Sequence, residues 1–350
     1  MSLDTDDIYV VTAERIFADL ADIQTVAHAA DDGWKPALWK ALEENGLTLA
    51  LTPEEAGGPG LALDEAMALL RAAGRFALAV PLAEAMLGNR MLGLAGLEPV
   101  DGVVVPLFST TAAPVIDAGG IVSGTLRRVP FARDAARFAV LCDGPSGPVV
   151  ALVDPAGCAL RHGTSLAFEP SDDVTLGGTA LAQAPAGEGA GDLLNLAATV
   201  RAQQIAGALE RVLEITVGYA MEREAFTKKI AKFQAVQHLL AQLGEETAAA
   251  VAAACSAADT LARGDSGLPA LLEVGAAKIR CGEAAQKASA IAHEVHGAIG
   301  YTAEHPLHRL TLRAQAWRDD HGTEAHWAVA LGRAIAADGA VALWPLMASR

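Results

Sequence analysis

The sequence predicts an α+β protein in which a small β domain lies between two helical regions. Residues 8–97 have helical periodicity, and residues 101–188 contain short apolar runs separated by turn residues. The remainder of the chain returns to long helical patterns with few helix breakers. Helices, then strands, then helices is an order that differs from the regular alternation of α/β folds. We therefore expect three domains, 1–100, 101–188 and 189–350.

The amino-terminal domain is expected to be entirely helical. In WKPALWKALEENGLTLA two tryptophans and two leucines recur at helical spacing, and Gly46 is suited to end that helix. LTPEEAGGPGLALDEAMALLRAAGR combines a glycine-rich turn with an amphipathic helix that has Asp64 and Glu65 in its first turn. A GGPG turn could cradle a phosphate, but such turns more often only connect two elements.

The middle domain is predicted from five short strand-like runs. They are VDGVVVPLF, GGIVSGTLRRV, RFAVLCDG, GPVVALVD and DDVTLGG. Because Gly, Pro and Asp stand between them, we expect one compact, mainly antiparallel β domain.

The carboxy-terminal domain is predicted to contain four long helices. We expect them at 192–222, 233–263, 268–298 and 304–337, interrupted by EREAFTKKIAKFQ and ARGDSGLP. These helices carry more apolar surface than one four-helix core needs, which predicts an oligomer built through them.

Composition excludes several classes of partner. The chain is 52% hydrophobic but only 5% aromatic, which favours closely packed helices. A formal net charge of −16 argues against a nucleic acid or an anionic membrane as a partner. The four cysteines form no CxxC pair, and the amino terminus has no signal-peptide pattern. No apolar run approaches the length of about 20 residues that spans a bilayer. We expect a cytoplasmic protein.

The segment RDDHGTEAH, residues 318–326, raises the question of a metal site. Six of the nine histidines fall between 293 and 326, and two pairs have ligand-like spacing: His293 with His296, and His305 with His308. There is no HExxH motif, however, so we expect no metal. The other hypothesis is a catalytic loop whose catalytic residue has been lost.

Three stretches together resemble the acyl-CoA dehydrogenase family. LTPEEAGGPGLAL is similar to the family's PEE.GG.G turn, and YAMEREAFTKKIAKFQAVQHLLAQL to its ER..FG..I..FQ loop. HEVHGAIGYTAEHPLHRLTLRAQAW is similar to the family's Q.hGG.GYt.E.pl.R segment. The resemblance implies an α-helical domain, a small antiparallel β-barrel and a four-helix bundle. It also implies the FAD-dependent oxidation of acyl-CoA thioesters to enoyl-CoA, in which a glutamate removes the α proton and the flavin accepts a hydride.

The resemblance assigns the FAD diphosphate contacts to two segments, of which the basic loop serves the flavin of a neighbouring subunit. The implied cofactor-binding residues are Arg223, Phe226, Gln234, Glu294, Gly297 and Ala298. Arg223 keeps a guanidinium suited to a diphosphate. Three positions depart from the family: Thr227 and Ala298 replace glycines, and Glu294 replaces a glutamine with a carboxylate that repels phosphate.

The parts that hold a subunit's own flavin are missing. The family carries a Trp-Ile-Thr or Trp-Ile-Ser run against the flavin ring, where this chain has Val129, Pro130 and Phe131. The β domain also lacks the family's GSD loop, which lines the acyl-CoA pocket.

The catalytic glutamate is missing as well. RDDHGTEAH stands at the family's EGT loop, and its base position is His321 when matched through Gly-Thr or Gly322 when counted from Arg313. The family's alternative base position falls near Ala198. Glu210, Glu214 and Glu324 are the remaining candidates for a substitute base, although each is more typical of a solvated helix residue.

We interpret the chain as a degenerate subunit that completes the flavin site of a partner. Some bacterial relatives are heterotetramers in which one type of subunit has lost its own site, and such assemblies often oxidise sterol or bile-acid side-chain CoA thioesters. The partners expected here are an acyl-CoA substrate and a related acyl-CoA dehydrogenase subunit or a second copy of this chain, in a dimer or tetramer. FAD would then bind only in the complex. Two alternatives stay open: a homomeric flavoenzyme with a base such as His321, and a flavin-free binding or scaffold protein.

Overall fold

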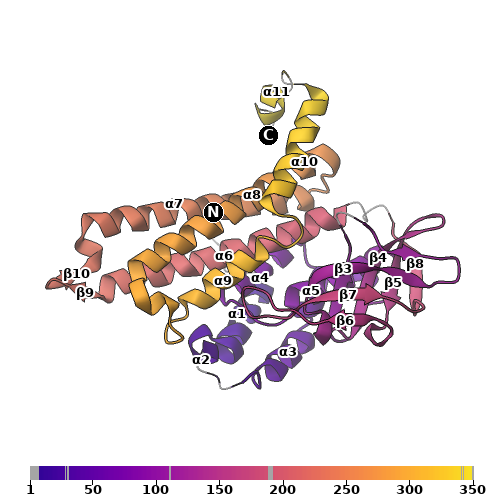
Figure 1. Ribbon diagram of the computed structural model, residues 1–350, viewed down its shortest axis with the longest axis horizontal. Helices are drawn as coiled ribbons and strands as arrows, with labels where there is room; N and C mark the ends of the chain where they lie inside the picture. Colours follow the sequence, from indigo (N-terminus) through magenta and orange to yellow (C-terminus); the bar gives the residue numbers. More distant parts are fainter. Residues whose placement is uncertain are drawn as a thin grey trace. The chain divides into compact units, whose positions relative to one another are not determined.

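The computed structural model describes residues 8–27, 29, 31–109, 112–187, 192–339, 341 and 343–348. The chain divides into two compact units, Met1–Leu194 and Asn195–Arg350, whose elements are labelled in Figure 1. Helices precede the strands and follow them, as the α+β prediction required. The finer division into three domains stays a prediction. In the described part of the chain, no helix is long and apolar enough to cross a membrane.

The first unit begins with five α-helices and two short 3-10 turns. The helices are α1 (Ile8–Ala21), α2 (Ile23–Ala27), α3 (Lys35–Glu44), α4 (Leu63–Arg75) and α5 (Leu82–Leu94), and the turns are η1 (Leu47–Leu49) and η2 (Glu54–Ala56). Helix α3 ends before Gly46, which has a φ of 69° that a glycine adopts without strain. Helix α4 starts with a carboxylate of Glu65 accepting the Ala62 N–H at 2.8 Å, as its acidic first turn predicts.

The GGPG turn between η2 and α4 is a tight connection within the first unit. A Cβ at Gly58 would lie 1.8 Å from the Thr52 carbonyl oxygen, so the two backbone segments approach too closely for any side chain there. The glycine at this position is therefore explained by packing of the chain against itself. No phosphate is needed to account for it.

The β region forms one sheet with mainly antiparallel pairing. Its strands are β1 (Val104–Leu107), β2 (Val115–Ile116), β3 (Val122–Pro130), β4 (Arg137–Gly144), β5 (Gly147–Val153), β6 (Ala159–Arg161), β7 (Ser171–Leu176) and β8 (Ala182–Pro185). The order is β6-β7-β3-β2-β4-β5-β8, and β1 pairs with β4. Among the described strands, only the pairings of β4 with β1 and with β2 are parallel. The prediction of a mainly antiparallel β domain is confirmed.

Both faces of the central strand β4 are buried. Phe138 and Val140 point into one core with strands β3, β5 and β7, whereas Ala139 packs on the other face with Met91 and Leu92 of α5. A strand covered on both faces needs a continuous apolar run, and RFAVLC supplies one. The five strand-like runs in the sequence correspond to β1, β3, β4, β5 and β7.

The second unit is a bundle of long helices. Its elements are α6 (Leu193–Glu222, which starts two residues before the unit), β9 (Glu224–Ala225), β10 (Lys228–Lys229), η6 (Ile230–Lys232), α7 (Gln234–Ala262), α8 (Gly267–His296), η7 (Gly297–Tyr301), α9 (Leu307–Trp317), α10 (Glu324–Asp338) and α11 (Leu343–Ala348). Figure 1 shows α6, α7, α8 and α9 running alongside one another. Gln203 of α6 ties two of them together by donating to the Ala254 carbonyl of α7 at 3.0 Å.

The predicted fourth helix, 304–337, is wrong as a single element. The structure has two helices, α9 and α10, separated by a turn over residues 318–323. His321 and Gly322 have φ angles of 54° and 101°, which a right-handed helix cannot contain. The apolar periodicity continues on both sides of this turn, which is why the sequence pattern reads through it.

Candidate functional site

The loop that resembles the family's flavin-contacting loop is a short β-hairpin. Strands β9 and β10 pair through a two-residue turn in which Phe226 and Thr227 both have positive φ, 49° and 67°. This conformation suits a two-residue hairpin, but it normally takes Asn or Gly rather than a bulky residue. Phe226 is 88% exposed at the tip, and its ring meets only the edge of Phe233 at 6.3 Å among the described rings. The hairpin therefore presents an aromatic side chain to solvent.

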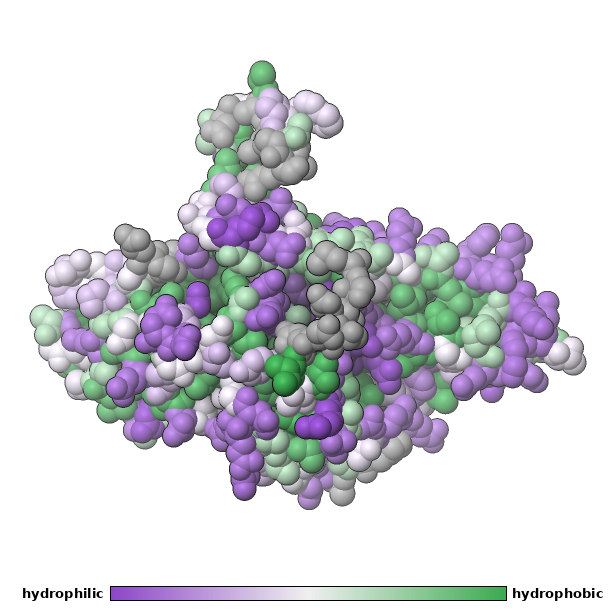
Figure 2. Space-filling view, turned by 180° about the vertical axis from the view of Figure 1, so that it is seen from behind, coloured by the Kyte–Doolittle hydropathy of each residue, from purple (hydrophilic) through white to green (hydrophobic). Residues whose placement is uncertain are grey.

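The basic side chains of this hairpin differ in the contacts that they make within the chain. Lys229 pairs with Glu224 at 3.1 Å, and Lys228 lies 4.2 Å from the centre of the Phe233 ring. Arg223 follows the last turn of α6 with an exposed side chain, and its guanidinium has no ion pair or hydrogen bond to any residue that the structure describes. In Figure 2 hydrophilic residues dominate this tip of the bundle. Arg223 is thus available to an anionic ligand.

The second predicted segment closes helix α8. Gly297 has φ 67° and ψ −145°, a backbone conformation open to glycine, and a Cβ built on it meets nothing within 4 Å. Glu294, Gly297 and Ala298 are exposed. The open surface over Gly297 fits the approach of a diphosphate, whereas the carboxylate of Glu294 opposes it.

Tyr219 brings these two segments to the same end of the bundle. Its hydroxyl donates to the His296 carbonyl oxygen at 3.3 Å, and its ring stacks on the His296 ring at 4.4 Å between centroids. The carboxyl ends of α6 and α8 therefore lie together, beside the hairpin (Figure 1). Gln234 begins α7, which follows the hairpin after the short turn η6.

Four histidines pack around this end of α8 and are held neutral. Burial lowers the pKa of His293, His296, His305 and His308, and for the first three the neighbouring histidines lower the pKa further. The rings of His296 and His305 are 4.6 Å apart, and His293 stacks on Tyr301 at 4.2 Å. Among the described residues, no group of three or more His, Cys, Asp or Glu side chains could hold a metal ion.

The turn that carries the family's base position is held closed by contacts within the bundle. Trp327 donates its indole N–H to the His321 carbonyl oxygen at 3.2 Å. A Cβ at Gly322 would lie 2.6 Å from the same indole nitrogen, so no other residue fits there without movement. Neither His321 nor Gly322 offers a carboxylate.

Two buried cations converge on this turn. Lys278 of α8 is 1% exposed and donates its ammonium to the carbonyl oxygens of Trp317 and Arg318 at 3.2 and 2.9 Å. Arg201 of α6 pairs with Asp320 through Nε and Oδ2 at 3.0 Å. Burial lowers the pKa of Lys278 to about 8, although Asp320 acts in the opposite direction. The lysine caps the end of α9, where backbone carbonyls lack partners in the helix.

His321 is a poor base in these surroundings. Burial, and then the charges of Arg201 and Lys278, hold the pKa of His321 well below its usual value. The imidazole is therefore neutral at pH 7, but its conjugate acid is unstable beside two cations. Because the rate of general-base catalysis falls with the basicity of the base, this histidine provides little driving force for α-proton removal.

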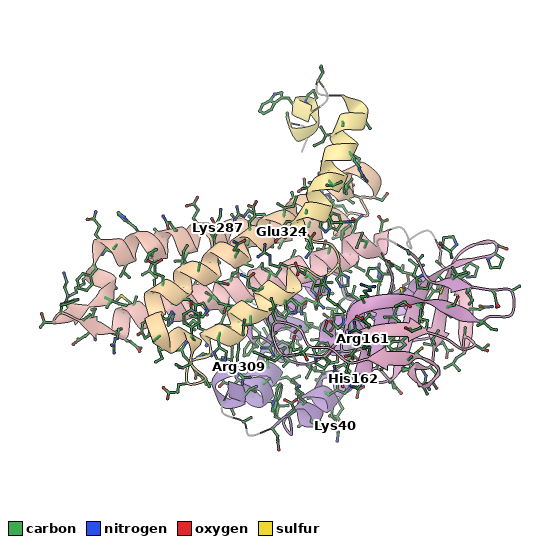
Figure 3. All side chains as sticks on the ribbon, viewed as in Figure 1. Lys40, Arg161, His162, Lys287, Arg309 and Glu324 are labelled. Atoms are coloured by element: carbon green, nitrogen blue, oxygen red, sulfur yellow. The ribbon has the colours of Figure 1, made fainter. Side chains whose placement is uncertain are left out.

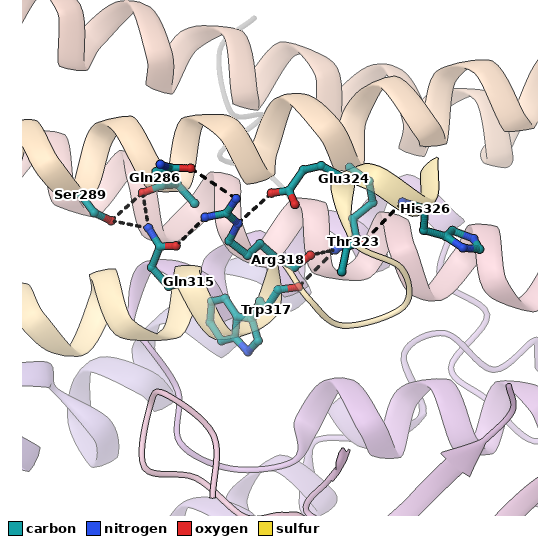
Figure 4. A network of polar contacts seen from close by, with 10 residues as sticks. Gln286, Ser289, Gln315, Trp317, Arg318, Thr323, Glu324 and His326 are labelled. Carbon is teal, nitrogen blue, oxygen red and sulfur yellow. Dashed lines mark hydrogen bonds and ion pairs between the residues drawn. The ribbon is translucent and has the colours of Figure 1, made fainter. Parts of the chain in front are cut away.

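The other candidate bases are occupied or unsuitable. Glu324 pairs with Arg318 at 2.7 Å, and Arg318 also donates to Gln315 and Gln286, as Figure 4 shows. Figure 3 places Glu324 at the start of α10 over the bundle. Glu214 pairs with Arg211 at 3.1 Å on the surface of α6. Ala198 has only a methyl group, and Glu210 is half-buried on α6.

The β-domain position of the family's flavin-contacting run is filled by apolar packing. Val129 belongs to the core of the sheet, and Phe131 is 6% exposed with a φ of 54° at the end of β3. Pro130 has no N–H to donate. Neither an indole nor a hydroxyl is present here, as the sequence indicated.

The two predicted parts of the site lie far apart within the second unit. Lys278 and His296 are both on α8, and their positions are separated by about 27 Å at roughly 1.5 Å per residue. One end of the bundle carries the base position and the other carries Arg223 and Gly297. The sequence patterns predicted both positions, but they did not predict that Lys278, Arg201 and Asp320 contact one of them. The only local signal was an isolated lysine within the apolar run GAAKIRC.

Comparison with known proteins gives the class of this chain. Residues 189–335 match the family model for the acyl-CoA dehydrogenase C-terminal domain. The chain is 30% identical over 294 residues to the acyl-CoA dehydrogenase IpdE2 of Mycobacterium tuberculosis, which covers 82% of this chain and 83% of that protein. The chain therefore belongs to the acyl-CoA dehydrogenase family. It is an oxidoreductase of the class that acts on CH–CH groups, and flavin is the cofactor of the family.

Two solved structures resemble the chain over nearly its whole length. The ChsE4–ChsE5 complex from Mycobacterium tuberculosis aligns with a TM-score of 0.80 at 23% identity, covering 94% of this chain and 97% of that one. A variant of the Tcur3481–Tcur3483 steroid ACAD aligns with a TM-score of 0.79 at 26% identity, covering 95% and 97%. The fold class predicted from the sequence is confirmed.

Proposed function

We propose that this chain is one subunit of an acyl-CoA dehydrogenase built from two related chains, and that it lacks a catalytic base of its own. In this assembly Arg223 binds the diphosphate of an FAD whose flavin ring faces the partner's active site. One contrast between two positions supports the proposal. The Arg223 guanidinium has no partner among the described residues, whereas the base position is filled by His321, which is neutral and lies beside two cations. The ChsE4–ChsE5 complex, a structural relative, supports an assembly of unlike chains.

The residues of the hairpin end fit one part of FAD. Arg223 supplies a guanidinium that can donate two parallel hydrogen bonds to a phosphate, and Gly297 leaves room for the diphosphate to approach the backbone. Glu294 remains exposed beside them and weakens the site, which suits a subunit that supplies only half of it. When bound, the flavin supplies the hydride acceptor for acyl-CoA oxidation.

The α proton of the substrate is removed by a carboxylate of the partner in this proposal. Among the described residues near the 318–323 turn, Asp320 is paired with Arg201 and Glu324 with Arg318. Moving either carboxylate to a substrate would leave a buried or half-buried arginine uncompensated. The distance of about 27 Å along α8 between Lys278 and His296 further supports the assignment of the two ends to different flavins.

Co-expression with a second, complete dehydrogenase chain from the same genome tests the proposal. We expect the chain purified alone to lack stoichiometric FAD and acyl-CoA dehydrogenase activity, because loss of the base alone lowers the rate roughly 10²–10⁴-fold. The complex should oxidise an acyl-CoA from a panel that includes steroid side-chain thioesters. In the complex Arg223→Ala should raise the dissociation constant of FAD by roughly 10- to 100-fold, because charge-assisted hydrogen bonds are lost.

Arg263→Ala is the matched control for Arg223→Ala. Arg263 is an exposed arginine at the far end of α7, about 43 Å from the hairpin along that helix, and it forms an ion pair with Asp265. FAD affinity should not change in this variant.

Two outcomes would favour the other functions. If the chain alone held stoichiometric FAD and had turnover that His321→Ala abolishes, the proposal would be replaced by a homomeric enzyme. A complex without flavin would favour a scaffold protein.

A further inference from the structure

Tyr219 connects the two segments that the proposed function assigns to the FAD diphosphate. Tyr219 lies in the last turn of α6 and Arg223 directly follows that helix, and the Arg223 backbone N–H donates to the Tyr219 carbonyl oxygen at 2.8 Å. On the other side, the Tyr219 hydroxyl donates to the carbonyl oxygen of His296, the residue before Gly297. One side chain thus links the residue that bears the cation to the turn that faces the ligand.

The Tyr219 hydroxyl serves a specific backbone group. His296 is the last residue of α8, so its carbonyl oxygen lies beyond the hydrogen bonds of that helix, at the point where the 3-10 turn η7 begins. Gly297 then turns the chain away with a φ of 67°. A hydrogen bond at 3.3 Å to this carbonyl fixes the direction in which the 297–298 backbone leaves the helix.

The imidazole under Tyr219 is buried and is hydrogen-bonded within its own helix. His296 is 4% exposed, and its Nδ1 donates to the Ala292 carbonyl oxygen at 2.8 Å within its own helix. The Tyr219 ring lies on this imidazole at 4.4 Å and 23°, and the His305 ring meets Tyr219 edge-on at 6.1 Å. The stack therefore positions α6 against an imidazole that α8 already holds in place.

We propose that Tyr219 is a positioning residue that sets the spacing between Arg223 and the Gly297–Ala298 backbone. This inference rests on the proposed function, because it assumes that both segments hold one diphosphate. Tyr219 does not touch the ligand itself. It acts through Arg223, whose place at the end of α6 depends on how that helix sits against α8.

A double-mutant cycle on the two-chain complex tests the inference. Tyr219→Phe keeps the ring stack and removes the hydrogen bond, so the dissociation constant of FAD should rise roughly fivefold. Tyr219→Leu removes both contacts and should weaken FAD binding further. In an Arg223→Ala background, Tyr219→Phe should change FAD affinity by less than about twofold, because the guanidinium that it positions is absent. If Tyr219 only stabilised the fold, Tyr219→Phe would weaken FAD binding by the same factor whether Arg223 is present or replaced by alanine.

Thr216→Val is the matched control on the same helix. Thr216 is buried and donates its hydroxyl to the Val212 carbonyl oxygen within α6 at 2.6 Å, so this change removes a hydroxyl without disturbing the link to α8. FAD affinity should stay at its original value.

Two results would overturn the inference while Arg223→Ala still supports the proposed function. Tyr219→Phe could weaken FAD binding equally in both backgrounds, or it could weaken it in neither. An unaffected Arg223→Ala complex would overturn both. If Tyr219→Leu does not fold, Tyr219→Phe decides the matter alone.

Discussion

The two ends of the carboxy-terminal bundle use their charged residues in opposite ways. At the hairpin end, Arg223 is exposed and has no ion-pair partner among the described residues. At the other end, Arg201 and Lys278 are buried, and both contact the 318–323 turn directly. The resemblance to the family's motifs predicts a ligand-contacting position at each end, and in the proposed function only the hairpin end offers a charge to a ligand.

This difference shows what the proposed loss of one site and retention of another would mean for the charged residues of a subunit. A charged group that is bound internally stabilises the fold and cannot also serve a substrate. A charged group left in solvent contributes little to stability, so its substitution can be tested for an effect on ligand binding alone. The closed turn and the open hairpin can therefore be distinguished by what each substitution costs in stability and in FAD binding.

The largest effect on stability is expected from Arg201→Ala. Removing the buried guanidinium breaks its ion pair with Asp320 and its hydrogen bond to Gln204, so the free energy of unfolding should fall by roughly 3 kcal/mol in urea denaturation. Arg223→Ala should change it by less than about 0.5 kcal/mol, because that side chain is exposed. If both substitutions cost the same, the proposed contrast between the two ends is wrong.

Arg211→Ala on the same helix is the control for an ordinary surface ion pair. Arg211 and Glu214 are 39% and 44% exposed, so loss of their contact should cost only a few tenths of a kcal/mol. Replacing buried Arg201 and half-buried Asp320 together with apolar residues, as in Arg201→Met with Asp320→Leu, should cost less than Arg201→Ala alone. No charge is then left buried without a partner.

Acidification is expected to destabilise the protein. The pKa values of His293, His296, His305, His308 and His321 are all lowered in the folded chain, chiefly by burial. Below the unfolded pKa of about 6.5 the unfolded chain therefore binds more protons than the folded chain. Stability is fully retained above this pH and is lost as the pH falls toward the folded values.

Urea denaturation at several pH values between 7.5 and 5.5 measures this loss. His296→Phe keeps a ring against Tyr219 but removes one titrating group, so its stability should depend less steeply on pH than that of the unchanged protein. A stability that stays constant, or rises, as the pH falls below about 6.5 would contradict the expectation of neutral buried histidines.

The smallest effect is expected from Thr227→Gly at the hairpin tip. Thr227 has a φ of 67°, which costs a β-branched residue roughly 1–2 kcal/mol, and glycine removes that strain at an entropic cost of about 0.5–1 kcal/mol. The unfolding free energy should rise by about 0.5 kcal/mol. Thr302 is extended, with φ −89°, so Thr302→Gly should lower stability instead. If thermal unfolding showed that both glycine variants are stabilised, or that both are destabilised, backbone strain would not be what distinguishes the two positions.

Local patterns in the sequence determined most of the architecture. Apolar periodicity predicted the helices that became α6, α7 and α8, and short apolar runs predicted the four longest strands and β1. They missed β2, β6 and β8, which have two to four residues each. Strands this short carry too little alternation to be recognised, since their pairing is decided by neighbouring strands.

The sequence also determined what the site lacks, but only the tertiary structure decided what the remaining groups do. The absence of a glutamate at His321 and Gly322, and the presence of Arg223 and Gly297, could be read residue by residue. The pairing of Arg201 with Asp320, and the contact of Tyr219 with His296, join residues 119 and 77 positions apart. Local periodicity records which face of a helix is buried. It does not record which distant charge or ring that face meets, because this depends on how the helices pack.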